Sequence, residues 1–231
     1  MKTPVALARC KTYDYEQVRE AVNKTIDSLG GIKGIVAPRS KVLLKPNLLN
    51  ESRPEECITT HPSVVEAIIC LLKGIDSEIF LGDSPSCFSQ KGAVDRIYEA
   101  TGMKEVCDRH GVRLVYFDNA VMKNNIPIAE WAQQCDYLIN IPKFKTHTLT
   151  ILTGALKNMF GCVTGMHKAK LHRDHLDMFD FSKRIVDVFE TVKPSFTLVD
   201  VIRALSGDGP GSAGIKTDTE FILAGHDALG V

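Results

Sequence analysis

The sequence lacks the features that would place the protein in a membrane or on a nucleic acid. The longest apolar stretch, 64–72, is too short to span a bilayer and contains Glu66. The 28 basic and 28 acidic residues cancel, whereas a general nucleic-acid binder carries a clear basic excess. The first residues contain no apolar segment of the kind that directs export. We therefore expect a cytoplasmic protein with no nucleic-acid partner and no membrane partner.

Clustered cysteines are also missing, because no two of the seven cysteines form a C-x-x-C pair. A zinc or iron–sulfur centre held by one chain needs ligands that lie close together. The sequence therefore predicts no metal site, no cofactor bound by this chain alone, and reduced, mostly buried thiols. The cysteines are Cys10, Cys57, Cys70, Cys87, Cys107, Cys135 and Cys162.

Two signatures of nucleotide binding are absent as well. The phosphate-binding pattern G-x-x-x-x-G-K-[ST] does not occur, and no G-x-G-x-x-G follows the first predicted strand. The aromatic residues, with Trp131 as the only tryptophan, are scattered and form no platform for stacking bases. We therefore expect neither a P-loop nor a standard dinucleotide site.

Short apolar runs that alternate with helical patterns dominate the rest of the sequence. Buried strands are predicted at 41–44, 78–81, 113–117, 137–141, 196–201 and 220–223. Helices are predicted at 15–29, 63–73, 94–110 and 179–192. Strands that alternate with helices indicate one α/β domain over 1–231, with a mainly parallel sheet and helices on both of its faces.

Polar residues follow the predicted strands at the edge where such sheets bind ligands. Lys45 and Asn47 follow the first strand, Asp83 and Ser84 follow the second, and Lys143 follows the fourth. We expect these side chains to contribute to a ligand site. Two interpretations of Asp83 stay open: it orients a ligand hydroxyl or a cation, or it only shapes a turn with Ser84.

Positive charge is concentrated in the segment 143–175, which contains six basic residues and one acidic residue. The segment also contains four of the seven histidines: His147, His167, His172 and His175. A concentrated positive field in a neutral protein attracts anionic substrates. The alternative is that these lysines form a solvated surface. The pair His172 and His175 is only a weak signal for a metal site.

Spacing within this segment indicates an anion site. Lys143, Lys145 and His147 alternate along the chain, so an extended strand would project all three side chains to one side. These cations would then act together on one ligand.

A helix is predicted over 150–160, directly after that strand. Gly154 would let a ligand approach the backbone, and free N–H groups at the start of a helix favour an anion. Lys157 and Asn158 lie about one turn further along. The pattern therefore predicts a phosphate or carboxylate bound between the beginning of this helix and several lysines.

Four segments together resemble the family known as domain of unknown function 362. They are 45–48 (KPNL), 60–62 (THP), 82–85 (GDSP) and 139–161 (INIPKFKTHTLTILTGALKNMFG). The resemblance runs from about residue 40 to the end of the chain, and the block 142–161 is highly specific. The domain is also distantly similar to the N-terminal region of nickel-dependent lactate racemase, from which we carry over no cofactor attachment.

Members of this family are often described as iron–sulfur proteins, because many carry a ferredoxin-like module in the same chain. This sequence lacks the corresponding cysteine run. The resemblance therefore implies 4Fe–4S clusters only on a missing module or on a ferredoxin-like electron-transfer partner. The family pattern normally continues into another helix beyond Val231, so we expect a domain truncated at its C-terminal end.

The sequence thus predicts an enzyme-like module that binds a small carboxylate or phosphate substrate. The catalytic candidates, which would move protons, are Lys145, His147 and His172. The ligand-binding candidates are Lys45, Asn47, Asp83, Ser84, Lys143, Gly154, Lys157, Asn158 and Lys168. The family setting implies redox chemistry with electrons from the ferredoxin-like module. Two alternatives stay open: racemisation or isomerisation by Lys and His bases, and a non-catalytic module for anion binding or electron-transfer docking.

Overall fold

The computed structural model describes residues 3–85 and 91–231 of the chain. The strands in this part are β1 (Val5–Arg9), β2 (Lys41–Pro46), β3 (Glu78–Asp83), β4 (Arg113–Tyr116), β5 (Ala120–Lys123), β6 (Ile126–Ala129), β7 (Tyr137–Ile141), β8 (Lys143–His147), β9 (Ile151–Thr153), β10 (Phe196–Gly207) and β11 (Gly214–Gly225). The helices are α1 (Tyr15–Ser28), α2 (Ile32–Ile35), α3 (Pro62–Lys73), α4 (Lys91–Ala100), α5 (Met103–His110), α6 (Trp131–Gln134), α7 (Ala155–Asn158), α8 (Gly165–Asp174) and α9 (Met178–Val192), with the short 3-10 helices η1 (Pro54–Glu56) and η2 (Met159–Cys162).

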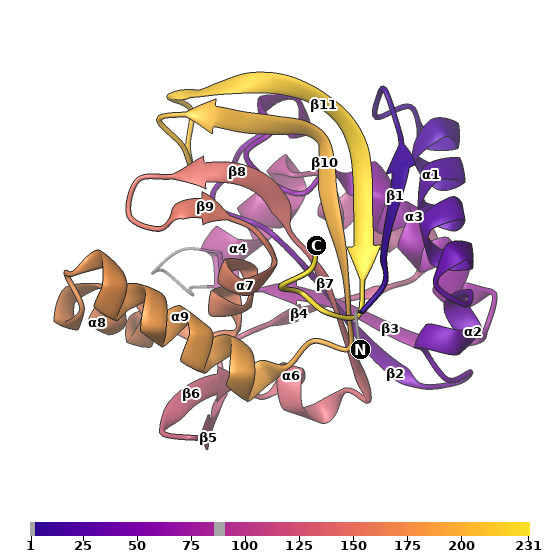
Figure 1. Cartoon of the computed structure of the whole chain (residues 1–231). Helices are drawn as coiled ribbons and strands as arrows, with labels where there is room; N and C mark the ends of the chain where they lie inside the picture. Colours follow the sequence, from indigo (N-terminus) through magenta and orange to yellow (C-terminus); the bar gives the residue numbers. More distant parts are fainter. Residues whose placement is uncertain (1–2, 86–90) are drawn as a thin grey trace.

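A mainly parallel sheet forms the centre of the molecule, as the sequence predicted (Figure 1). Its strand order is β1–β11–β10–β7–β2–β3–β4, and β8 and β9 are attached beside β10. The strands from β10 to β4 pair in parallel, whereas β1, β11 and β9 pair with their neighbours antiparallel. The carboxyl ends of β2 and β3 therefore lie at one edge of the sheet.

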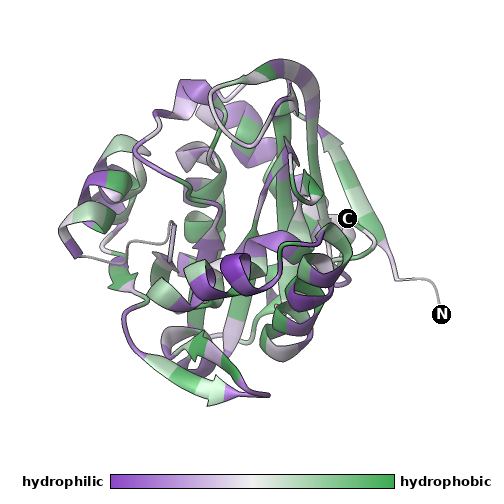
Figure 2. Cartoon of the chain, turned by 90° about the vertical axis from the view of Figure 1, so that its left-hand side faces the viewer, coloured by the Kyte–Doolittle hydropathy of each residue, from purple (hydrophilic) through white to green (hydrophobic). Residues whose placement is uncertain are grey.

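Two hydrophobic clusters cover the two faces of this sheet, because successive side chains of a buried strand point to opposite sides. On β2, Leu44 packs with α1, α3, α4 and α5, whereas Leu43 packs on the other face with α9 and η2. Leu81 and Phe80 of β3 divide in the same way. Figure 2 shows the hydrophobic residues concentrated on the central strands and on the inner sides of the helices. The prediction of helices on both faces is confirmed.

The helix predicted over 94–110 is two helices. α4 ends at Ala100 and α5 begins at Met103, with Gly102 between them at a φ of 75°. That backbone conformation is easy for glycine and ends a right-handed helix. The apolar periodicity continues across the break, which explains why the sequence pattern predicted a single element.

The helix predicted over 150–160 is wrong. Ile151–Thr153 forms strand β9, which pairs antiparallel with β8 through Lys145 opposite Thr153 and His147 opposite Ile151. Only Ala155–Asn158 is α-helical, and η2 follows it. Pairing with β8 supplies backbone partners that a helix would otherwise provide, so tertiary context overrides the local helical pattern.

The six cysteines in the described residues are free thiols, and four of them are buried. Cys87 lies outside the described residues. Within the described part of the chain, no helix combines the length and the apolar character needed to cross a membrane.

Candidate functional site

A polar cavity of about 260 Å³ lies at the carboxyl ends of β2 and β3. Loop residues after these strands line it together with side chains from β8, β9, α7, η2 and α8. Nine of the twelve predicted site residues line this polar cavity: Lys45, Asn47, Asp83, Ser84, His147, Lys157, Asn158, Lys168 and His172.

A buried ion pair between neighbouring strands lies at the base of the polar cavity. Lys45 Nζ is 2.7 Å from Asp83 Oδ1, and both side chains are at most 2% exposed. The Asp83 carboxylate also accepts hydrogen bonds from the backbone N–H groups of Leu48 (2.9 Å) and Ser84 (2.8 Å). These bonds orient the carboxylate and hold the two strand-end loops against each other. Asp83 therefore both shapes its loop and balances the charge of Lys45.

Asn158 of α7 connects this ion pair to the sheet. Its Oδ1 accepts hydrogen bonds from Lys45 Nζ (3.0 Å) and Asn47 Nδ2 (3.2 Å). Its Nδ2 donates to the Lys45 carbonyl oxygen (3.1 Å) and to Asn140 Oδ1 (2.8 Å). All of the polar groups of Asn158 are thus used inside the protein, and its role is to position Lys45 and Asn47.

Gly161 lies where no larger residue fits. A Cβ atom at this position would collide with Asp83 Oδ1 and with Lys45 Nζ. The backbone of η2 therefore passes directly against the Lys45–Asp83 pair. The helix predicted over 150–160 ends just before Gly161, and the close approach of this glycine to the ion pair is visible only in three dimensions.

Three buried side-chain oxygens that line the polar cavity have no hydrogen-bond partner among the described residues. They are Asn47 Oδ1, Ser84 Oγ and Thr153 Oγ1. Ser84 and Thr153 are only 3% and 2% exposed. Buried polar groups in native proteins are nearly always paired, and an unpaired one costs about 1–3 kcal/mol. A polar ligand in the cavity would supply the missing partners.

Lys157 and Lys168 add positive charge on the same cavity wall. Burial, and next the nearby charge of Lys45, lower the pKa of Lys157 to about 8. Lys168, which is 5% exposed, donates a hydrogen bond to the carbonyl oxygen of Ser84. The lysines of this wall are enclosed rather than spread over a surface, so the solvated-face interpretation does not apply to them.

The two cavity histidines are neutral at physiological pH. Burial, followed by the charges of Lys157 and Lys145, lowers the pKa of His147 to about 4. His147 Nδ1 accepts from the backbone N–H groups of Leu149 (3.1 Å) and Thr150 (3.3 Å), which leaves the proton on Nε2. Burial and the same Lys157 charge also lower the pKa of His172.

His172 is held by aromatic rings. It stacks on Phe181 with ring centroids 4.4 Å apart, and the ring of Phe160 meets it edge-on at 5.4 Å. A neutral imidazole in this position is suited to accept a proton, whereas His147 presents an N–H donor.

Three predicted site residues do not line the polar cavity. Lys143 Nζ pairs instead with Asp200 Oδ2 (3.1 Å) and with Tyr13 Oη (2.5 Å). Lys145 Nζ donates a hydrogen bond to the Ile58 carbonyl oxygen (2.5 Å). Gly154 lines a separate groove between β9 and α9. The expectation that Lys143, Lys145 and His147 act on one ligand is therefore not met.

Lys145 nevertheless belongs to the same electrostatic environment. Burial, and then the charges of Lys157 and Lys143, lower its pKa to about 7. Its side chain is 2% exposed and is not part of the cavity lining. Lys145 thus contributes field to the site without lining it.

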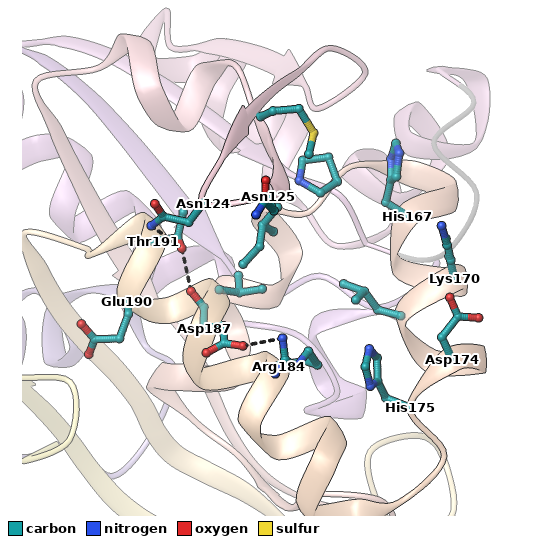
Figure 3. A pocket seen from close by; sticks show the side chains of 15 residues that line it. Asn124, Asn125, His167, Lys170, Asp174, His175, Arg184, Asp187, Glu190 and Thr191 are labelled. Carbon is teal, nitrogen blue, oxygen red and sulfur yellow. Dashed lines mark hydrogen bonds and ion pairs between the residues drawn. The ribbon is translucent and has the colours of Figure 1, made fainter.

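Helix α8 separates the polar cavity from a larger cleft, the α8–α9 cleft, of about 730 Å³. Lys168 and His172, four residues apart, face the polar cavity, whereas His167, Lys170 and Asp174 face the cleft. Figure 3 shows the latter three along α8, with Arg184 directed toward Asp187 on α9 at 2.9 Å. The cleft carries charges of both signs on exposed side chains and gathers none of the predicted site residues.

His172 and His175 do not converge. His175 lines the α8–α9 cleft, and its Nδ1 lies 2.5 Å from Asp180 Oδ2. Among the described residues, no group of three or more His, Cys, Asp or Glu side chains is arranged to hold a metal ion. The described side chains thus offer hydrogen-bond donors and positive charge rather than a set of metal ligands.

Sequence reasoning missed Asn140, Thr153 and Gly161 as contributors to this site. Asn140 is a polar residue inside the apolar run 137–141 and is fully buried. A buried asparagine in a central strand needs partners, so this residue was the one available signal. Thr153 and Gly161 gave no comparable signal, because their roles depend on β9 and η2.

Comparisons with known proteins agree with the fold and identify the family. The chain is 33% identical over 217 residues to the thylakoid-associated protein sll1697 of Synechocystis sp., covering 91% of this chain and 66% of that protein. The lactate racemase apoprotein from Thermoanaerobacterium thermosaccharolyticum matches with a TM-score of 0.59 at 9% identity, covering 96% of this chain and 54% of that chain. This second match confirms the α/β fold alone.

The chain spans less than two thirds of the length of either protein. One relative is described as thylakoid-associated, so the cytoplasmic location stays a prediction. The model of the family described as Domain of unknown function (DUF362) matches residues 42–231, and the chain therefore belongs to the DUF362 family.

Proposed function

We propose that the chain binds a small carboxylate or phosphate ester in the polar cavity and moves a proton on it. The observation that carries this proposal is the convergence of unpaired buried oxygens and enclosed lysines. Ser84 Oγ and Thr153 Oγ1 lack partners among the described residues, and Lys157 lines the same cavity. An anionic ligand accepts hydrogen bonds from all of these groups at once.

The charge of the polar cavity supports an anion. Lys45 and Asp83 compensate each other, and Lys157 and Lys168 add positive charge beyond that pair. His147 contributes an Nε2–H donor without a charge. A carboxylate or phosphate supplies acceptor oxygens for these donors, whereas a cationic ligand would meet repulsion.

The two imidazoles supply proton-transfer chemistry. Neutral His172 accepts a proton from a bound substrate, and the nearby positive charges of Lys157 and Lys168 stabilise the negative charge that develops. His147 Nε2–H donates to a substrate oxygen. Lys145, which does not line the cavity but interacts electrostatically with Lys157, strengthens the positive field.

Racemisation or isomerisation is the specific version that this geometry favours. His147 and His172 come from different elements, β8 and α8, and line one cavity. Such an enzyme would exchange a hydrogen on the substrate carbon with solvent, so deuterium uptake into a 2-hydroxy or 2-oxo acid in D₂O is its readout. The redox version, with electrons from a ferredoxin-like module, rests on the family membership alone.

The test is a calorimetric titration of the purified protein with sulfate, phosphate and lactate. Lys168→Ala should weaken binding of the anions that bind by at least about tenfold, because a charge-assisted hydrogen bond is worth about 1.5–3 kcal/mol. Lys170→Ala is the matched control, since Lys170 lies on the same helix but faces the α8–α9 cleft. Equal losses in the two variants would show that α8 attracts anions non-specifically and would end the proposal.

A further inference from the structure

Lys157 is placed differently from the other lysines near the polar cavity. Lys45 and Lys143 are paired with aspartates, and Lys145 and Lys168 donate to carbonyl oxygens. Among the described residues, the Lys157 amine has neither a hydrogen bond nor an ion pair, and the residue lines both the polar cavity and the neighbouring groove between β9 and α9. Its nitrogen is therefore accessible to a ligand rather than engaged by the protein.

Local hydrogen bonds fix the backbone that carries this amine. Lys157 lies on α7, between the buried residues Asn158 and Ala155, and Asn140 binds the carbonyl oxygen of Ala155 at 2.9 Å. Asn158, the next residue along, is anchored by its hydrogen bonds to Lys45 and Asn140. The backbone that carries Lys157 is thus fixed on both sides, and the side chain extends from a rigid base.

The environment also makes this amine easier to deprotonate than an ordinary lysine. With its pKa lowered to about 8 by burial and by Lys45, Lys157 is mainly a cation at pH 7, and about a tenth of it carries a lone pair there, far more than for an ordinary lysine. An unprotonated lysine beside groups that bind an anion is the arrangement found where lysine acts as a nucleophile toward carbonyl compounds.

We propose that Lys157 forms an imine with a small carbonyl compound whose carboxylate or phosphate group is held by the rest of the polar cavity. This inference rests on the proposed function and names the substrate class: 2-oxo acids or phosphorylated ketones and aldehydes. Lys168, Ser84 and His147 bind the anionic group and the carbonyl oxygen, and these contacts direct the carbonyl carbon toward Lys157.

The bond changes balance without any further reactant. The neutral Lys157 nitrogen attacks the carbonyl carbon, the C–N bond forms, and the carbonyl π electrons move to oxygen. That oxygen takes up a proton and the nitrogen loses one, which gives a carbinolamine. Loss of the hydroxyl as water takes up one further proton, which His172 relays from solvent, and leaves a protonated imine. The carbon adjacent to the imine carbon then loses a proton easily. Neutral His172, which lines the same cavity, is the base for that step.

The test uses pyruvate and dihydroxyacetone phosphate as probes, each with sodium borohydride, followed by intact-protein and peptide mass spectrometry. Borohydride delivers hydride to the imine carbon and converts the linkage to a stable secondary amine. We expect a single modification on the peptide that contains Lys157, formed with pyruvate, with dihydroxyacetone phosphate, or with both. The two probes distinguish a carboxylate from a phosphate as the bound anion.

Two variants complete the design. Lys157→Arg keeps the positive charge and should lose the trapped adduct, whereas Lys170→Arg, in the α8–α9 cleft, should trap as well as the unchanged protein. Calorimetric binding of each probe is measured in parallel. Probe binding without trapping at Lys157 would overturn the imine and leave the anion site intact. Absence of binding for every anion and both probes would overturn the proposed function itself, and trapping spread over many lysines would overturn the imine.

Discussion

Two lysine–aspartate pairs, each joining neighbouring parallel strands, are buried in this protein and differ in what surrounds them. Lys45–Asp83 joins β2 to β3, and Lys143–Asp200 joins β8 to β10. Both pairs are almost completely buried. Around Lys45–Asp83, however, oxygens of the polar cavity lack hydrogen-bond partners. By contrast, no buried polar side-chain atom of Lys143, Asp200 or the neighbouring Tyr13 and His61 lacks a partner among the described residues.

In the second pair, Lys143–Asp200, aromatic side chains and a backbone N–H group supply further contacts to the buried charges. Tyr13 Oη donates to Asp200 Oδ1 (2.8 Å), the His61 backbone N–H donates to Asp200 Oδ2 (3.0 Å), and the rings of Tyr13 and His61 stack 3.8 Å apart. His61 Nδ1 also accepts from the Ser63 backbone N–H at the start of α3. Of the two buried pairs, only Lys45–Asp83 lies beside polar groups that lack partners among the described residues, which is why the proposed ligand site is placed there.

The largest expected effect is on stability, and it comes from the Lys143–Asp200 pair. Lys143→Met should lower the free energy of unfolding by about 3–5 kcal/mol, because it leaves Asp200 buried without its cation. Urea denaturation measures this loss. Anion affinity in the folded protein should stay within about twofold of the original, since Lys143 does not line the polar cavity.

The same substitution at Lys45, in the Lys45–Asp83 pair, separates the contribution to stability from the contribution to anion binding. Lys45→Met should cost a similar free energy of unfolding and should also abolish anion binding, because Lys45 lines the cavity and orients Asp83. If the folded Lys143→Met protein loses anion binding as completely as the Lys45→Met protein, the two pairs do not differ in the way described here.

A smaller effect is expected at Gly161, which the Lys45–Asp83 pair touches. Gly161→Ala should weaken anion binding about tenfold and lower stability by about 1–3 kcal/mol, because its methyl group collides with the ion pair. Gly154→Ala is the control, since a methyl group there meets only ordinary van der Waals contacts with Leu152. Calorimetry and urea denaturation of both variants make the comparison, and an unaffected Gly161→Ala protein would contradict the packing described.

The smallest expected effect is a pH dependence of sulfate affinity. Lys157 is protonated below its lowered pKa of about 8, so its attraction for an anion is present at pH 7 and is lost as the pH rises through 8. Lys145 adds a shallower loss from about pH 7. Affinity measured by calorimetry should fall about fivefold between pH 7 and pH 9. Lys157→Arg, which stays charged, should show a clearly flatter profile, and identical profiles would remove Lys157 from the anion site.

Much of the fold followed from apolar periodicity alone. The strands β2, β3 and β7 and the helices α1, α3 and α9 lie within a few residues of their predicted bounds. Long buried strands and amphipathic helices carry strong local patterns. Strands β1, β5, β6 and β9 were not predicted, because short or exposed strands depend on partners far away in the sequence.

The sequence predicted the positions of the residues at the ends of β2 and β3 better than those of the lysines on β8. Residues at the ends of β2 and β3 had to meet, because parallel strands bring their carboxyl ends to one edge. The division between Lys143 and Lys145 was not predictable from alternation, because Asp200 and Ile58 come from other elements and engage each lysine separately. The two sides of α8, by contrast, follow from three- and four-residue spacing, which would have separated Lys168 and His172 from Lys170.

The most direct test of the central claim is a crystal structure with a bound anion. Crystals grown without sulfate or phosphate are soaked in selenate, and the anomalous signal of selenium locates the ion. We predict a peak inside the polar cavity, within hydrogen-bonding distance of Lys157, Lys168 or Ser84 Oγ. A selenate ion found only in the α8–α9 cleft or on the outer surface, with the polar cavity holding none, would contradict the assignment of this cavity as the anion site.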